Sequence, residues 1–288
     1  MVEVLVHFVA PALVGVLIGI ASGLLGIGGG TVMVPIFRLA FGMSATMSTA
    51  TSLFAIIPTS ISGAISHVKG KTCIPALGIA AGLGGACLSP VGVWLAQLSP
   101  DWLVMLAAAL IIGYSAINMF KKAFKIPRAG QPAEGADAAA ATPSLTSSGE
   151  PAVSAPTADD SSLSRKQLLQ GAAIGLVAGL ASGYVGVGGG FIMVPLMLSI
   201  IGIPMRKASG TSLIAVMILA IPGVIEQGII GNINYLAGIA IVIGTIPGAA
   251  IGARLVTKVP ERTLRLLFGC FLIVAAVMLV LNEVGIFG

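Results

Sequence analysis

Charged residues are scarce in this sequence. They make up 9% of its 288 residues, against about 25% in a typical soluble domain, and the mean hydropathy is +1.06. A chain with so little charge cannot cover its surface for water. The sequence therefore predicts an integral membrane protein, and apolar runs of about 20 residues indicate helical spans rather than the alternating strands of a barrel.

Cysteine and histidine are also scarce, and their positions form no motif. The three cysteines share no short spacing, so we expect neither a disulfide framework nor a metal site, and we interpret them as small packing residues. The chain has two histidines and no H-E-x-x-H, G-x-S-x-G or Walker sequence, which excludes the commonest hydrolases and direct ATP drive. No basic, aromatic-rich patch indicates nucleic acid. We expect no enzyme and no cofactor.

One polar segment interrupts the hydrophobic sequence. Between Lys121 and Lys166, alanine, proline, serine and glycine dominate, and large apolar residues are rare. Such a stretch buries too little apolar surface to offset the entropy of ordering it. We predict a first transmembrane repeat at residues 1–122, a flexible cytoplasmic linker at 123–166 and a second transmembrane repeat at 167–288.

The two halves repeat each other in sequence. The stretch ASGLLGIGGGTVMVP at 21–35 returns as ASGYVGVGGGFIMVP at 181–195, with ten of the fifteen residues identical. The offset of 160 residues continues downstream, where TSL at 51–53 matches TSL at 211–213. Duplicated halves of membrane proteins often build a transport path between them.

Each half contains four long apolar segments and one short segment that follows a glycine-rich knot. The first knot is residues 26–30, and the second knot is residues 186–190. The long segments are 4–25, 44–66, 74–97 and 102–120, then 168–186, 207–226, 234–254 and 263–282; the short ones are 31–41 and 191–201. A short helix rises about 16 Å and an unwound knot adds about 16 Å, enough for a hydrocarbon core of about 30 Å. We predict an all-α polytopic membrane protein with two inverted repeats, each of four long transmembrane helices plus one short broken helix after the knot.

The basic residues favour this crossing of the short segments. If the short segments enter the membrane and return on the same side, the fifteen Lys and Arg residues divide eight to seven between the two sides. If they cross, all but Arg38 share the linker's side, as expected when basic residues collect in the cytoplasm. We therefore predict a multi-pass protein of a bacterial-type plasma (inner) membrane, with the linker cytoplasmic and both termini outside.

The knots are candidates for an anion-binding site. Unwound backbone in a bilayer needs protein or water around it, and glycine lets a ligand approach the backbone. The short helices begin near Thr31 and Phe191, so their free amides face the knots and favour anions. Two such knots would meet near the membrane's middle. The predicted substrate-binding residues are Gly28, Gly29, Gly30, Thr31, Thr51, Ser52, Gly188, Gly189, Gly190, Thr211 and Ser212.

Plainer roles compete with these functional ones. Gly15, Gly19 and Gly23 recur every four residues, which is typical of close helix packing, and Thr and Ser hydroxyls commonly bond back to their own helix. His67 and Glu226 are ionisable and lie near predicted span ends. For these two residues, proton coupling and an ordinary interfacial position both stay open.

The doubled knot followed by V-P, the downstream TSL and the long mid-chain linker resemble the TauE/SafE sulfite exporter family, also called the toluene sulfonate uptake permease family. The resemblance covers nearly the whole chain outside the linker. The first repeat reads TATSL, where the second has Gly210 in SGTSL and follows the family's pattern more closely. The resemblance implies secondary transport of sulfite, sulfonates or similar small sulfur-containing or organic anions, with no catalytic residue.

Two other classes stay open beside an anion carrier. An anion channel would share all these features, and a membrane scaffold protein would use the glycines only for helix packing. The expected partners are a small anionic substrate and the lipid bilayer. The exact substrate, the direction of transport, the coupling ion and homo-oligomerisation are left open.

Overall fold

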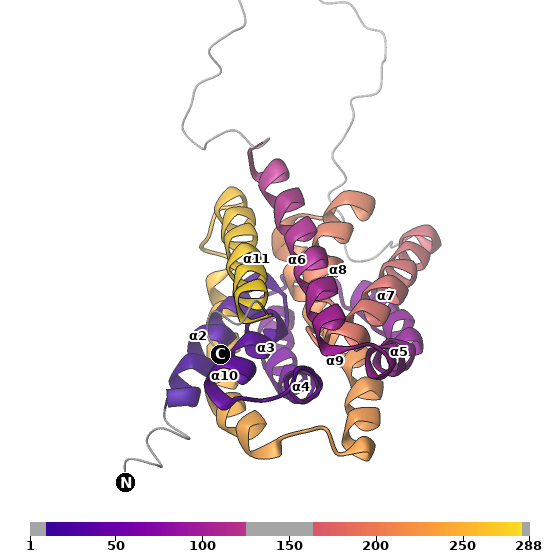
Figure 1. The fold of residues 1–288 in the computed structure, drawn as a ribbon. Helices are drawn as coiled ribbons and strands as arrows, with labels where there is room; N and C mark the ends of the chain where they lie inside the picture. The colour runs from indigo at the N-terminus through magenta and orange to yellow at the C-terminus, as the bar shows by residue number, and fades with distance from the viewer. Residues whose placement is uncertain (1–9, 125–163, 284–288) are drawn as a thin grey trace, which may run out of the picture.

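The computed structural model describes residues 10–124 and 164–283, and every element within them is a helix (Figure 1). The first repeat contains α2 (Ala10–Leu25), α3 (Gly30–Phe41), α4 (Ala45–Lys69), α5 (Pro75–Leu98) and α6 (Asp101–Phe124). The second contains α7 (Arg165–Val185), α8 (Gly190–Leu196), the π-helix η2 (Met197–Ile201), α9 (Met205–Ile230), α10 (Tyr235–Leu255) and α11 (Glu261–Glu283). Most of the predicted linker, and residues 4–9 of the first predicted span, lie outside the described residues.

Seven of the described helices are long and apolar enough to cross a membrane, from α4 to α7 and from α9 to α11. They coincide with seven of the eight long segments predicted from the sequence, all except the segment at 4–25. The described part of the remaining long segment, α2, has 16 residues. The short segments form α3 in the first repeat, and α8 with η2 in the second. The chain is an integral, multi-pass membrane protein.

Helix starts are fixed by side chains that reach the first free amides. The Ser44 side chain accepts from the amide of Met47 at 3.2 Å and caps α4. The Asp101 carboxylate, at the start of α6, also accepts from the amide of Ala45 at 3.3 Å. Glu261 at the start of α11 binds the amide of Met205 in the same way, at 3.3 Å. α6 and α11 each begin on the acidic residue that follows a proline, Pro100 or Pro260.

The two repeats interlock through their glycine-rich helices. α2 packs against α10 of the other repeat, and α5 packs against α7. A β-carbon added at Gly19 would overlap the carbonyl of Thr245, and one at Gly175 would overlap the carbonyl of Ala81. These glycines therefore let the helix backbones touch. The packing role expected for the four-residue glycine ladders is confirmed.

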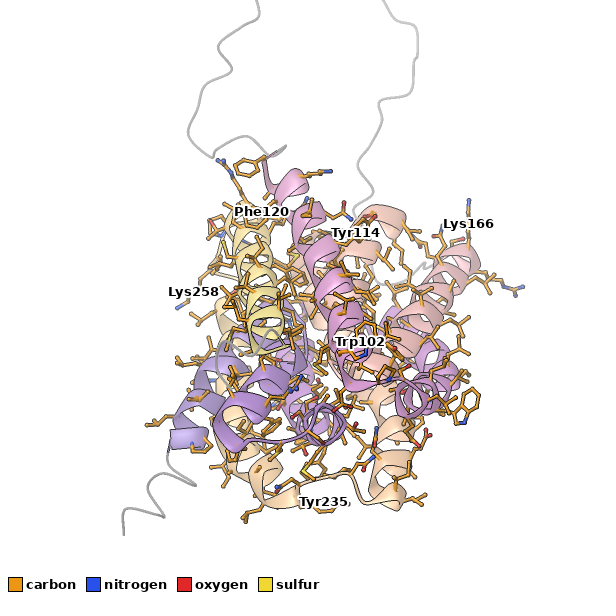
Figure 2. The ribbon with its side chains drawn as sticks, viewed as in Figure 1. Trp102, Tyr114, Phe120, Lys166, Tyr235 and Lys258 are labelled. Carbon is orange, nitrogen blue, oxygen red and sulfur yellow. The ribbon has the colours of Figure 1, made fainter. Side chains whose placement is uncertain are left out.

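α4 and α9 pack against each other at the centre of the molecule. The end of α4 lies beside the start of α9, since a β-carbon at Gly210 would be 2.8 Å from Nδ1 of His67. α6 and α11 lie side by side (Figure 1). Lys166 and Phe120 lie toward the end of the molecule that carries the linker, and Tyr235 lies at the opposite end (Figure 2).

Candidate functional site

The two knots are breaks in helical structure that only glycine accommodates easily. Gly28 and Gly29 have φ of +82° and +87°, and Gly188 and Gly189 have φ of +89° and +67°. These angles lie in the left-handed region, where a β-carbon is strained. α2 and α7 end just before the knots, and α3 and α8 begin on their last glycines. The knots are thus short unwound stretches between a long helix and a short one.

The structure brings the two knots together. A β-carbon added at Gly30 would lie 2.6 Å from the carbonyl oxygen of Val187, and one at Gly190 would lie 2.5 Å from that of Gly26. Gly28 and Gly188 also share their nearest side chains, which are Ile56 and Val216. Ile56 lies near the middle of α4 and Val216 near the middle of α9. The knots therefore meet halfway along the central helix pair.

The Ser residues of the two Thr-Ser pairs hold the knots in place. Ser212 Oγ donates to the carbonyl of Gly26 at 2.7 Å, and Ser52 Oγ donates to the carbonyl of Gly186. Each hydroxyl shares its single proton with a carbonyl of its own helix, Ser212 with that of Ser209 at 2.8 Å and Ser52 with that of Thr49 at 2.9 Å. Carbonyls that lipid could not satisfy are thereby paired across the repeats.

The Thr residues of the pairs make an equivalent crossed contact. Thr51 Oγ1 accepts from the amide of Asn234 at 3.0 Å, and Thr211 Oγ1 accepts from the amide of Ile74 at 2.9 Å. Asn234 is the N-cap of α10 and Ile74 is the N-cap of α5. In this conformation, all four hydroxyls of the pairs are engaged with protein.

Four other buried hydroxyls near the knots, those of Ser22, Thr31, Ser60 and Ser182, have no hydrogen-bond partner among residues 10–124 and 164–283. The Oγ of Ser60 lies 3.5 Å from the β-carbon position of Gly28, and the Cβ of Ser22 lies 3.6 Å from that of Gly29. Thr31 was predicted, whereas the three serines were missed. Ser22 and Ser182 stand four residues before Gly26 and Gly186 in the repeated A-S-G, and this identity was the available signal.

The backbone of the knots also carries free donors. Within the described part of the chain, the amides of Gly28, Gly29, Gly188 and Gly189 donate to no carbonyl. Their nearest side chains are apolar or carry a hydroxyl. Because amides and hydroxyls converge without a charged group, the centre can donate hydrogen bonds to an anion. All residues from 25 to 31 and from 185 to 191 are buried, so this centre is closed on both sides.

His67 and Glu226 lie apart from each other. His67 is fully buried at the end of α4, with Nε2 2.8 Å from the carbonyl of Gly23 and Nδ1 2.7 Å from Thr72 Oγ1. Its equivalent Gln227 accepts from the side chain of Asn232 at 2.8 Å, so the second repeat keeps the counterpart of the His67–Thr72 contact without an ionisable group. Glu226 lies near the end of α9, and its buried Oε2 has no hydrogen-bond partner in the part of the chain that the structure describes.

Two broken helices that meet at the centre of a multi-pass helical protein are typical of secondary membrane transporters. The family model described as "Sulfite exporter TauE/SafE" matches residues 11–279. The chain belongs to the TauE/SafE sulfite exporter family, and this family indicates a membrane transporter.

Two bacterial proteins resemble the chain along most of their length, and a plant protein resembles part of it. The "Probable membrane transporter protein YunE" of Bacillus subtilis is 26% identical over 97% of this chain and 99% of its own. The "Probable membrane transporter protein" of Haemophilus influenzae is 28% identical over 94% of this chain and 97% of its own. "Sulfite exporter TauE/SafE family protein 3" of Arabidopsis thaliana is 30% identical over 36% of this chain and 23% of its own. No solved structure matches the chain.

Proposed function

We propose that the protein is a secondary transporter that moves a small sulfur-containing or organic anion, such as sulfite or a sulfonate, across the plasma membrane. One observation carries this proposal: the two knots meet halfway along α4 and α9, and free amides and unpartnered hydroxyls gather there. The substrate would be held by the amides of Gly28, Gly29, Gly188 and Gly189 and by the hydroxyls of Ser22, Thr31, Ser60 and Ser182. The Thr-Ser pairs would hold the knots around it.

The chemistry of this centre favours a monovalent anion over a divalent one. The nearest side chains of the knots provide no cation, so hydrogen-bond donors alone would replace the anion's hydration. The cost of desolvating an ion rises with the square of its charge, and unpaired buried charge is expensive. We expect monovalent sulfonates and hydrogensulfite to be preferred over sulfate.

Alternating access between two inverted halves fits the same geometry. The central helices are equivalent by the 160-residue offset and run in opposite directions, since the end of α4 lies beside the start of α9. Basic residues of both repeats also gather, with Lys71, Arg206 and Lys207 lining one cavity. Inverted halves with a cytoplasmic linker would place these residues on the linker's side. Since the centre is buried on both sides, the helices must part to admit substrate.

The test is anion flux into liposomes that contain the purified protein, with sulfite, thiosulfate, methanesulfonate, sulfate and chloride as substrates. We expect saturable flux of the sulfur monoanions that is stimulated by unlabelled substrate on the opposite side, as a carrier requires and a channel does not. Ser22→Ala/Ser60→Ala removes two donors to a charged ligand and should lower this flux at least about tenfold.

Ser89→Ala is the matched control, because Ser89 Oγ is also buried and unpartnered but faces Gly223 rather than a knot. Its flux should stay at the wild-type value. Full flux in Ser22→Ala/Ser60→Ala would place the substrate elsewhere. Absence of flux for every anion would indicate that the knot glycines serve helix packing alone. Substituting the knot glycines themselves is a poorer test, because Gly29 and Gly189 have positive φ and crowded surroundings.

A further inference from the structure

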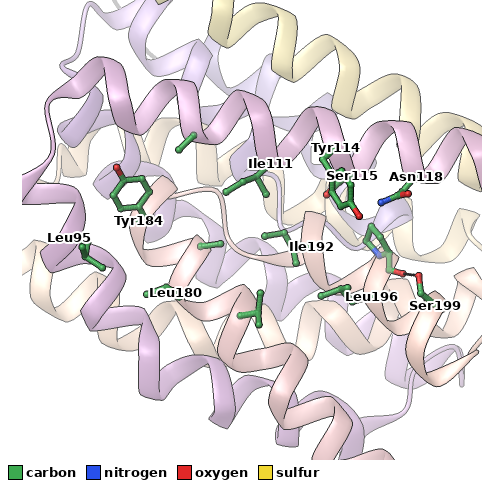
Figure 3. Close-up of a pocket in the computed structure, with 14 residues that line it drawn as sticks. Leu95, Ile111, Tyr114, Ser115, Asn118, Leu180, Tyr184, Ile192, Leu196 and Ser199 are labelled. Carbon is green, nitrogen blue, oxygen red and sulfur yellow. Dashed lines mark hydrogen bonds between the residues drawn. The ribbon is translucent and has the colours of Figure 1, made fainter.

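A second cavity lies at the side of the helix bundle, away from the paired knots. It has a volume of about 770 Å³ and is enclosed by α5, α6, α7, α8 and η2 (Figure 3). Its lining is mostly apolar, and lining residues such as Tyr114 and Val177 are 69% and 56% exposed. Since α5, α6 and α7 are long and apolar enough to cross a membrane, the cavity opens toward lipid rather than toward water.

Polar side chains gather at one end of this cavity. Tyr114, Ser115, Asn118 and Ser199 lie close together there, whereas Leu95 and Tyr184 lie at the other end (Figure 3). Ser199 Oγ donates to the carbonyl of Pro195 at 2.6 Å. The side chains of Ser115 and Asn118 have no hydrogen-bond partner among the described residues. An amide and a hydroxyl that face hydrocarbon without a partner are costly, which points to a ligand with acceptor groups.

The fold itself does not require these polar residues, because the other repeat lacks them. At the offset of 160 residues, each polar lining residue has an apolar equivalent: Val274, Ala275, Met278, Leu39 and Leu24 replace Tyr114, Ser115, Asn118, Ser199 and Tyr184. The space differs as well, since the equivalents of Ala107 and Ile111 are the larger Leu267 and Phe271. The cavity and its polar lining therefore have no counterpart at the equivalent positions of the other repeat.

The polar end lies toward the linker. Asn118 is six residues before the end of α6 at Phe124, after which the linker follows. The exposed Lys121 stands one turn beyond Asn118, about 4.5 Å further along the helix axis. Along α6 the order is therefore apolar surface, neutral donors and a cation. A glycerophospholipid presents acyl chains, ester carbonyls and a phosphate in the same order.

We propose that this cavity binds one glycerophospholipid from the leaflet on the linker's side. An acyl chain fills the apolar part of the cavity, the ester carbonyls accept hydrogen bonds from Asn118 and Ser115, and the phosphate lies at Lys121. This site is independent of the anion site proposed at the knots.

Native mass spectrometry of the detergent-purified protein with added dioleoylphosphatidylglycerol tests the site. We expect one retained lipid per chain. The diether analogue, which has the same chains and headgroup but no ester carbonyl, should be retained about tenfold less, as expected for two lost hydrogen bonds. Lys121→Gln should weaken retention of both lipids. Equal retention of the diester and diether lipids would overturn the proposed contacts.

The other repeat supplies the variants. Ser115→Ala/Asn118→Met introduces the residue types of the second repeat at these two positions. Lipid retention by this variant should fall about tenfold, and retention equal to that of the wild type would overturn the proposal. The reverse exchange, Ala275→Ser/Met278→Asn, should add no second lipid, because Leu267 and Phe271 occupy the space; a second lipid would overturn the role of the cavity. If the first variant does not fold, Ala107→Leu/Ile111→Phe fills the cavity and leaves the polar pair intact. It should exclude the lipid, and retention would again overturn the site.

Discussion

The hydroxyl of Ser212 in the second repeat donates a hydrogen bond of 2.7 Å to the carbonyl of Gly26 in the first. Ser52 and Gly186 make the same contact with the repeats exchanged. Each knot is therefore held by a long helix of the other half. Because the carbonyls lie at membrane depth, no water is available to donate a hydrogen bond to them in place of the serine hydroxyl.

Ser212→Ala should destabilise the protein by about 1–3 kcal/mol, since it leaves the carbonyl of Gly26 buried without its donor. Thermal unfolding of the purified protein in detergent measures this loss. Ser48→Ala is the control, because the Oγ of Ser48 is buried but bonds to nothing in the described structure, so that its removal strands no partner. Equal destabilisation by the two substitutions would contradict the structural role of Ser212.

Gly175→Ala should destabilise the protein by about 1–3 kcal/mol, the usual cost of overpacking, because its β-carbon overlaps the carbonyl of Ala81 and pushes α7 away from α5. Gly113→Ala in α6 is the matched change, since a β-carbon there meets nothing within 4 Å. It should be neutral or stabilising by up to about 1 kcal/mol. Thermal unfolding distinguishes the two, and a similar loss in both would show that α5 and α7 do not touch through backbone.

His67→Gln/Thr72→Asn places the residues of the second repeat in the first. We expect normal folding, because Gln227 and Asn232 already form this pair in the equivalent position. If His67 couples transport to protons, the variant should keep anion flux but lose its response to an imposed pH gradient, since an amide does not take up a proton. The control is Glu226→Gln. A gradient response that survives both substitutions would exclude both residues from coupling.

Cysteines placed at Lys71, Pro100, Gly231 and Lys258 in a cysteine-free background report the orientation of the halves. All four positions are exposed. Inverted repeats should shield Lys71→Cys and Lys258→Cys from an impermeant thiol reagent added outside, and leave Pro100→Cys and Gly231→Cys reactive. Lys71 and Gly231 are equivalent by the offset of 160 residues, so parallel repeats would label them alike.

The helix boundaries were predictable because the thickness of the bilayer fixes how long an apolar run must be. The segment expected at 74–97 is α5, Pro75–Leu98, and its start is marked by the proline itself. The knots were predictable for a similar reason, because three adjacent glycines fit poorly inside an ordinary helix.

The partners of individual side chains were not predictable. Periodicity marks a glycine face on α2 but does not say that α10 covers it. Thr59 and Ser60 are neighbours of similar chemistry, yet Thr59 bonds with Thr245 Oγ1 at 2.6 Å, whereas Ser60 faces the knot without a partner. A rotation of 100° between adjacent helix positions decides these fates, and it depends on the packing of distant segments.

The crossed packing of α2 with α10 and of α5 with α7 has a consequence for how the chain is made. When the first half has entered the membrane, the small-residue faces of α2 and α5 have no packing partner, because α10 and α7 are synthesised later. We therefore expect that neither half folds alone, and that packing is completed only after α10 has left the ribosome. Once the two halves have packed against each other, the covalent connection between them should be dispensable. Two separately encoded halves should therefore assemble into the same molecule.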